Sequence, residues 1–237
     1  MITLPPTVFI VDPNAAGRHA LGATIRRAGL RAESFASAGE FLARPRSGAP
    51  SCLLLELAPR AIDAFALQHR VSIERKETPV IVMSSEVDVA SLVQAMKAGA
   101  VEVFMKPVAD DVLLQAVGEA LARSRAVLQQ EDDIQALRQR YDALSVRERE
   151  VMGRVVAGLL NKQVGAALGI SVVTVKAHRG RVMRKMGAES LAGLVAMALR
   201  LDLRLAVSPR ASTSVSRVPL ADLARRQVSN SFSSAAR

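Results

Sequence analysis

Hydrophobic positions in the first half of the chain form short runs that alternate with helical patterns. Strand-like apolar runs occur at 7–11, 52–55 and 80–83, with weaker candidates at 31–35 and 101–104. Helical spacing of apolar residues extends over about 14–28, 37–43, 62–75, 87–97 and from 109 onward. Short buried strands that alternate with helices predict a parallel sheet with helices on both faces.

Five strands within about 120 residues favour an α/β domain of the flavodoxin-like, doubly wound (βα)5 type. In such a sheet, ligands meet the carboxyl ends of the strands. The residues expected there are polar or charged, namely Asp12, Glu56, Ser84 and Lys106. No Gly-rich phosphate loop follows the first strand, because 12–17 contains a single glycine, and no catalytic Ser/His/Asp set stands out. We therefore expect no enzymatic activity.

The second half of the chain shows helical patterns alone. Ser145 and Glu148 have the spacing of a capping box, and Gly158 can end the helix that they begin. A short helix closed by Gly169 comes next, followed directly by a helix with Ser171 as its N-cap. Helix, glycine turn and basic helix are the layout of a helix-turn-helix DNA reader. A last helix at about 190–201 is apolar enough to cover the other three, which predicts an all-α, four-helix domain.

The helix over 171–186 is amphipathic, with one apolar and one basic face. Its predicted buried stripe consists of Val172, Val175, Val182, Met183 and Met186. Its opposite face carries Lys176, Ala177, Gly180, Arg181 and Arg184. Small residues let the backbone approach a groove, and long cations reach phosphates and base edges. On this helix alone, an ordinary solvated basic face is the alternative.

Net charge is distributed unevenly between the two halves. Residues 1–140 contain 16 Lys and Arg against 16 Asp and Glu, whereas residues 141–237 contain 16 against 6, a net charge of +10. The whole excess therefore lies in the half with the helix-turn-helix pattern, as expected of a DNA-binding half joined to a neutral one.

The stretch LSVREREVMGRVVAGLLNKQVGAALGISVVTVKAHRGRVMRKMGAESLAGLV resembles the LuxR-type DNA-binding domain of FixJ/NarL-type response regulators over nearly the whole of 144–201. The resemblance implies that Lys162 and Thr174 contact phosphates, and that Lys176, Ala177 and Gly180 face base edges. It also implies that Arg181 and Lys185 add backbone contacts. We count these residues, with His178 and Arg184, as the candidate DNA-binding set.

Two residues of the basic helix need separate interpretation. Arg179 lies inside the apolar stripe, so we expect it to pair with Glu148 or Glu150, with DNA contact as the alternative. His178 lies at the edge of the stripe. It has no Cys or His partner, so we expect a packing or phosphate-contacting residue and no metal site.

The first half resembles a response-regulator receiver domain of the FixJ type over about 5–122. The stretches that carry the resemblance are VFIVDPNAAGRHAL, CLLLELAP, PVIVMSSEVDV and AMKAGAVEVFMKPV. Such receivers are phosphorylated on an aspartate after the third strand and bind Mg²⁺ through two acidic residues after the first. This chain keeps Asp12, Ser84 and Lys106, but Pro13 stands at the second acidic position and Glu56 at the phosphoacceptor position.

These departures predict a receiver that is not phosphorylated by the ordinary route. Pro13 provides no carboxylate, and a Glu56 carboxylate is displaced by one methylene from an in-line pose, where a misplacement of about 1 Å costs about a hundredfold. Glu56 could reach Lys106 and Ser84 as a built-in mimic, or the domain could be a dimerisation scaffold. By resemblance, the pairing face lies at about 87–108, with Val89, Val93, Met96 and Lys97. A conventional phosphorylation-switched regulator is the alternative.

The remaining features set the expected domain organisation. We expect a receiver-like domain at 1–122, a linker helix at 109–140, a DNA-binding domain at 141–205 and a disordered Ser/Arg-rich tail at 206–237. The linker helix forms a short coiled coil or a plain solvated connector.

Composition narrows the setting and the partners. One cysteine, Cys52, excludes a disulfide framework, and no signal peptide or apolar run of about 18 residues is present, which favours a cytoplasmic protein without a membrane partner. The expected partners are double-stranded DNA and a second copy of the chain. We expect no cofactor. A kinase or partner protein is not indicated by the sequence.

Overall fold

The computed structural model describes residues 5–57, 62–85 and 89–203, and the chain divides into two compact units, 1–139 and 140–237. The expected tail at 206–237 lies outside the described residues. Among the described helices, none combines the length and apolar character that crossing a membrane requires.

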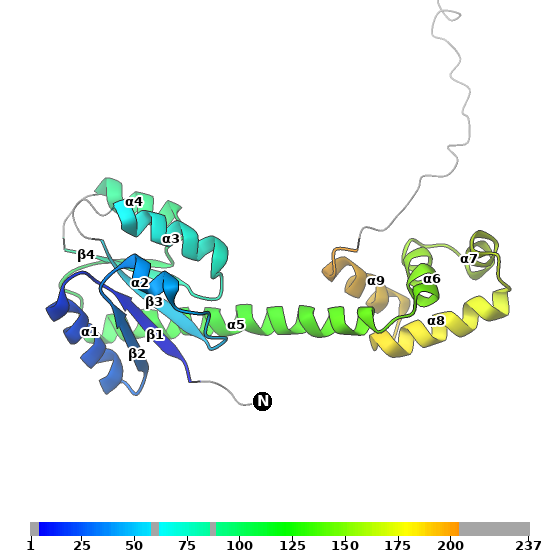
Figure 1. Cartoon of the computed structure of the whole chain (residues 1–237), viewed down its shortest axis with the longest axis horizontal. Coiled ribbons are helices and arrows are strands. Elements are labelled where there is room, and N and C mark those ends of the chain that lie inside the picture. The colour runs from blue at the N-terminus through cyan, green and yellow to red at the C-terminus, as the bar shows by residue number, and fades with distance from the viewer. Residues whose placement is uncertain (1–4, 58–61, 86–88, 204–237) are drawn as a thin grey trace, which may run out of the picture. The chain divides into compact units, whose positions relative to one another are not determined.

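The first unit is a five-stranded parallel sheet with the strand order β2-β1-β3-β4-β5, as a doubly wound fold requires (Figure 1). The strands are β1 (Thr7–Val11), β2 (Arg31–Phe35), β3 (Ser51–Leu57), β4 (Val80–Ser84) and β5 (Glu102–Met105). The helices are α1 (Ala15–Arg27), α2 (Ala38–Ala43), α3 (Ile62–Glu74), α4 (Val89–Lys97) and α5 (Asp110–Asp142). The predicted α/β fold is therefore confirmed.

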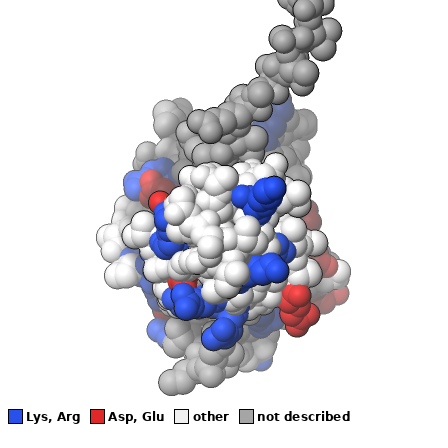
Figure 2. Space-filling view, turned by 90° about the vertical axis from the view of Figure 1, so that its right-hand side faces the viewer, with Lys and Arg blue, Asp and Glu red and all other residues white. Residues whose placement is uncertain are grey.

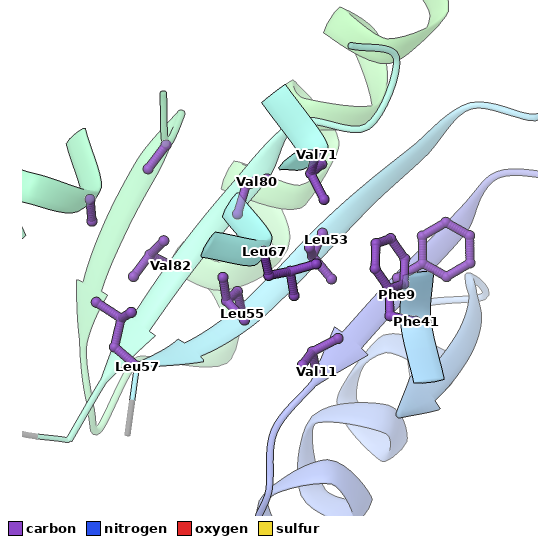
Figure 3. Packing of buried hydrophobic residues seen from close by; sticks show 12 residues of the cluster. Phe9, Val11, Phe41, Leu53, Leu55, Leu57, Leu67, Val71, Val80 and Val82 are labelled. Carbon is purple, nitrogen blue, oxygen red and sulfur yellow. The ribbon is translucent and has the colours of Figure 1, made fainter. Parts of the chain in front are cut away.

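Two hydrophobic clusters cover the two faces of the sheet. On one face, side chains of α2, α3 and α4 pack on alternate strand residues; Figure 3 shows Phe41 and Leu67 against Phe9, Leu53 and Leu55. On the other face, Ile25 of α1 and residues of α5 pack on the remaining strand positions, which include the fully buried Cys52. Burial on both faces explains why the central strands are continuous apolar runs.

The second unit contains α6 (Val146–Val156), α7 (Asn161–Leu168), α8 (Val172–Met186) and α9 (Leu191–Arg200). The predicted capping box is present, since Ser145 Oγ accepts from the Glu148 N–H while Glu148 accepts from the Ser145 N–H. Gly169 closes α7 in the left-handed region at φ 65°, which allows the sharp turn into α8.

The buried stripe of α8 is narrower than predicted. Val175, Val182 and Met186 are at most 1% exposed, but Val172 is 39% exposed, so its predicted burial is wrong. Val172 is the first residue of α8, where the helix has only just begun to contact its neighbours. Val175 packs with Val151, Val155 and Val164 in the core of the unit.

Candidate nucleic-acid interface and carboxylate pocket

The outer face of α8 carries exposed cations that have no partner among the described residues. Lys176, Arg181 and Arg184 on α8 and Lys162 on α7 are exposed. None of the four forms a hydrogen bond or ion pair within the described part of the chain. Figure 2 views the molecule from the side on which Figure 1 draws α7 and α8 and shows Lys and Arg side chains separated by uncharged surface. Unpaired cations on one helix face are available to phosphates.

Lys185 differs from these four cations because it serves an internal contact. Its Nζ lies 2.8 Å from Glu148 Oε2 and donates to the Ala143 carbonyl oxygen at 3.1 Å. The hydrogen bond from Lys185, with further bonds at Ser145, holds the pKa of the Glu148 carboxyl below its ordinary value. The structure thus places this cation in the contact between α6 and α8.

The expected pairing of Arg179 with Glu148 or Glu150 is wrong. Arg179 Nη1 donates instead to Asn161 Oδ1 at 3.3 Å, which ties α8 to the first residue of α7. Glu150 accepts from Arg147 at 2.7 Å. Arg179 is half-buried, and this hydrogen bond joins α8 to α7.

Two further members of the candidate set lie at the edge of the face. Thr174 is half-buried, and its Oγ1 lies 2.8 Å from Ser171 Oγ. His178 is half-buried, and its Nδ1 is buried without a hydrogen-bond partner. Ala177 and Gly180 are exposed, and a Cβ added to Gly180 would meet nothing within 4 Å.

Sequence reasoning missed two residues that set the position of α7. A Cβ at Gly165 would lie 2.8 Å from the Ile170 carbonyl oxygen, so a larger residue would push the turn away. Arg147 Nη2 donates to the Leu168 carbonyl oxygen at 2.7 Å, so a carbonyl group at the C-terminal end of α7 has a hydrogen-bond partner. In the sequence, a glycine inside the helical pattern at 161–168 indicates that another part of the backbone passes close to this position.

At the carboxyl edge of the sheet, two carboxylates share one lysine. Lys106 Nζ lies 2.5 Å from Glu56 Oε2 and 3.4 Å from Asp12 Oδ2. Asp12 is 1% exposed, and its Oδ1 accepts from the Asn14 N–H at 2.7 Å. The chain ends of β1, β3 and β5 therefore bring these three predicted residues together.

The other predicted pocket residues occupy different positions around this pair. Ser84 is buried at the end of β4, while the neighbouring Ser85, which the sequence did not single out, donates to Glu56 Oε1 at 2.9 Å. Pro13 is exposed, and its carbonyl oxygen accepts from Arg18 Nη1 at 3.0 Å. The same Arg18 atom donates to the Asp12 carbonyl oxygen at 2.7 Å.

These residues do not fit a Mg²⁺ site of the receiver kind. Mg²⁺ takes six oxygen ligands in near-octahedral geometry. Pro13 offers no carboxylate, and the carboxylates of Asp12 and Glu56 are both held by the Lys106 ammonium. In the described residues, no group of three or more His, Cys, Asp and Glu is placed to hold a metal ion.

A doubly wound domain with an acidic pocket and lysine at its carboxyl edge, followed by a helix-turn-helix with exposed cations, defines a class of protein. That class is the response regulator of two-component systems, in which a receiver domain precedes a DNA-binding domain. The family described as response regulator receiver domain matches residues 8–118, and the bacterial regulatory proteins of the luxR family match residues 142–198.

Individual relatives are similar to this chain over about four fifths of its length. Nodulation protein W of Bradyrhizobium diazoefficiens is 37% identical over 190 residues, 80% of this chain and 84% of the relative. Transcriptional regulatory protein FixJ of Rhizobium meliloti is 37% identical over 193 residues, 81% of this chain and 95% of the relative. The solved structure of the response regulator StyR is 34% identical, covers 83% of this chain and 100% of its own, and has a TM-score of 0.71. The chain belongs to the FixJ-like response regulators, which are DNA-binding transcriptional regulators.

Proposed function

We propose that this regulator binds double-stranded DNA through the outer face of α8 and the start of α7, and that its receiver acts without aspartyl phosphorylation. The DNA-contacting residues of the proposal are Lys162, Thr174, Lys176, Ala177, His178, Gly180, Arg181 and Arg184. Lys185 is a positioning residue, because its ammonium is held by Glu148. The proposed domain limits are 1–122 for the receiver, 109–140 for the linker helix, 141–205 for the DNA-binding domain and 206–237 for the tail.

Salt-dependent DNA binding by charge-removing variants tests the proposed face. Arg181→Ala removes one phosphate contact, which should lower the slope of log K against log salt by about 1. Lys176→Ala should weaken specific binding by about 1–3 kcal/mol and relax preference at one base position. Arg138→Ala on α5 is the matched control, since it removes an exposed cation from the other unit. Equal slopes and affinities for all three variants and the parent chain would disprove the assigned face.

One contact supports the second half of the proposal. Glu56 Oε2 lies 2.5 Å from Nζ of Lys106, the lysine that a receiver uses to hold its phosphoryl group. Glu56 is longer than aspartate by one methylene, its Oε1 accepts a hydrogen bond from Ser85, and its Oε2 forms an ion pair with Lys106. A carboxylate held in this way is a poor nucleophile for phosphoryl transfer and a fixed anion at the switch position.

Glu56 variants distinguish a built-in mimic from an inert scaffold. If the Glu56–Lys106 pair holds the active state, Glu56→Gln should weaken DNA affinity and dimerisation by at least about fivefold, the lower end of typical coupling between sites. Glu102→Gln, at an exposed position on β5, removes the same charge from the same domain and serves as the control. Unchanged affinity and dimerisation in Glu56→Gln and Glu56→Ala would eliminate the mimic and leave the scaffold.

We also propose that the receiver pairs with a second copy of the chain. Val93 and Met96 on α4 are 46% and 51% exposed, and Met105 on β5 is 41% exposed. Neighbouring exposed apolar residues of this kind are a feature of protein interfaces. Sedimentation of the chain with Met96→Lys should show a shift toward monomer, whereas an unchanged dimer would place the interface elsewhere.

A further inference from the structure

One large apolar side chain stands in the middle of the proposed DNA-binding surface. Val173, the second residue of α8, is 77% exposed, the largest value for a large hydrophobic residue in the described part of the chain. It is not among the residues of the core cluster around Val175. Valine is also a weaker helix former than alanine, so neither burial nor helix propensity explains it here.

The position of Val173 on the helix places it with the candidate base-facing residues. At about 100° per residue, Val173, Ala177, Gly180 and Arg184 fall within a sector of about 60° on the side opposite the buried Val175 and Val182. Lys176 and Arg181 flank this sector, one on each side. The centre of the face is thus apolar or bare for its first two turns and basic only at its far end.

An apolar group at this point can read one feature of DNA. In the major groove, the thymine C5-methyl group is the apolar feature of the base edges, and small aliphatic side chains contact it. The first residues of a recognition helix are those that reach base edges. Around Val173 lie the exposed Lys176, Arg181 and Arg184, which form no hydrogen bond or ion pair within the residues that the structure describes. These cations favour a polyanion over an apolar protein partner as the occupant.

We propose that Val173 is a specificity-determining residue that contacts a thymine methyl group, with Ala177 leaving room for that base. The inference rests on the proposed function, because it requires the outer face of α8 to enter the major groove. It goes beyond that function by naming a base and the atom group that is recognised.

The test combines removal of the methyl group from DNA with removal of the valine from the protein. A duplex is first selected from a random pool by binding to the full chain. Each thymine of that duplex is then replaced by deoxyuridine, one position at a time, and affinities are measured for the parent chain, Val173→Ala and the control Val146→Ala. Val146 is 75% exposed and is the first residue of α6, so it is a valine of similar exposure on a different helix.

At one or two positions, the methyl deletion should weaken binding of the parent chain by about fourfold, the value of one buried methyl group. Val173→Ala should bind the parent duplex about fivefold more weakly and be insensitive to the methyl deletion at those positions. Val146→Ala should behave as the parent chain. The melting temperature of Val173→Ala should not fall, because the residue is exposed and alanine favours the helix.

Other outcomes separate the inference from the proposed function. In one outcome, Lys176→Ala weakens specific binding, but methyl deletions affect the parent chain and Val173→Ala equally. That outcome would overturn the role of Val173 and leave the proposed DNA-binding face intact. If neither Lys176→Ala nor Val173→Ala changes specific binding, the assignment of DNA binding to the outer face of α8 is wrong, and so is the inference. Failure to enrich any duplex would overturn both.

Discussion

Replacing Lys185 with methionine separates structural cations from DNA-binding cations on α8. The variant keeps the apolar stem and removes the ammonium, which bonds to Glu148 and to the Ala143 carbonyl. Glu148 is 4% exposed, but its Oε2 also accepts from the Ser145 N–H at 2.9 Å, so it keeps one bond. We therefore expect less than the loss typical of breaking a fully buried pair, about 3–5 kcal/mol.

The exposure of Lys185 lowers the expected loss further. A hydrogen bond to a charged group contributes about 1.5–3 kcal/mol. Because the Lys185 side chain is 42% exposed and water screens the pair, we expect a loss of about 1–2 kcal/mol in the helical unit. For a domain of this size, that loss corresponds to a fall in melting temperature of about 5–10 °C. Thermal unfolding of the full chain measures it. Arg184→Met is the control, because the Arg184 side chain forms no hydrogen bond or ion pair within the described residues.

The decrease in the free energy of unfolding at acidic pH should change as well. The pKa of Glu148 is lowered in the folded chain, so its contribution to the free energy of unfolding is present above its unfolded pKa and is lost as pH falls through the folded pKa. Without Lys185, the two pKa values approach each other and the acid loss becomes shallower. DNA affinity of the folded variant should match that of the parent chain. An unchanged melting temperature together with a DNA defect as large as that of Arg181→Ala would show that Lys185 contacts DNA and that our assignment is wrong.

Three other predictions address packing and burial. Gly165→Ala should destabilise the helical unit by about 1–3 kcal/mol, because its Cβ would meet the Ile170 carbonyl oxygen at 2.8 Å. In the same thermal scan, Gly180→Ala should stabilise the unit by about 0.5–1 kcal/mol, because its Cβ would meet nothing within 4 Å. Equal effects of the two variants would contradict the close approach at Gly165. Ser124→Ala should lower the free energy of unfolding of the first unit by about 1–3 kcal/mol in urea. The buried Ser124 hydroxyl accepts from the Ser51 N–H and donates to the Glu77 carbonyl oxygen. An unchanged free energy of unfolding would mean that these bonds add nothing. Burial raises the pKa of Cys52 to about 12, so iodoacetamide at pH 8 should label it only after denaturation, and rapid labelling of the native chain would contradict its place in the core.

The sequence predicted the fold well where burial is complete. β1, β3 and β4 are central strands, and their continuous apolar runs follow from burial on both faces. β2 and β5 are the edge strands of the sheet, partly exposed, and for that reason their patterns were weaker.

Helical periodicity does not predict which side chains of two different helices pair with each other. Arg179 and Lys185 both lie on α8, and helical spacing alone does not decide which of them meets Glu148 on α6. The crossing of the two helices decides it, and it selects Lys185. Ser85 escaped notice for a similar reason, because its contact with Glu56 depends on the path of the chain after β4.

The most direct test of the central claim is the intact mass of the full chain after incubation with acetyl phosphate and Mg²⁺, with DNA affinity measured on the same samples. The close Glu56–Lys106 pair and the missing carboxylate at Pro13 predict no gain in mass and the same affinity before and after treatment. A gain of one phosphoryl group that tightens DNA binding would contradict the account and make the protein a conventional phosphorylation switch.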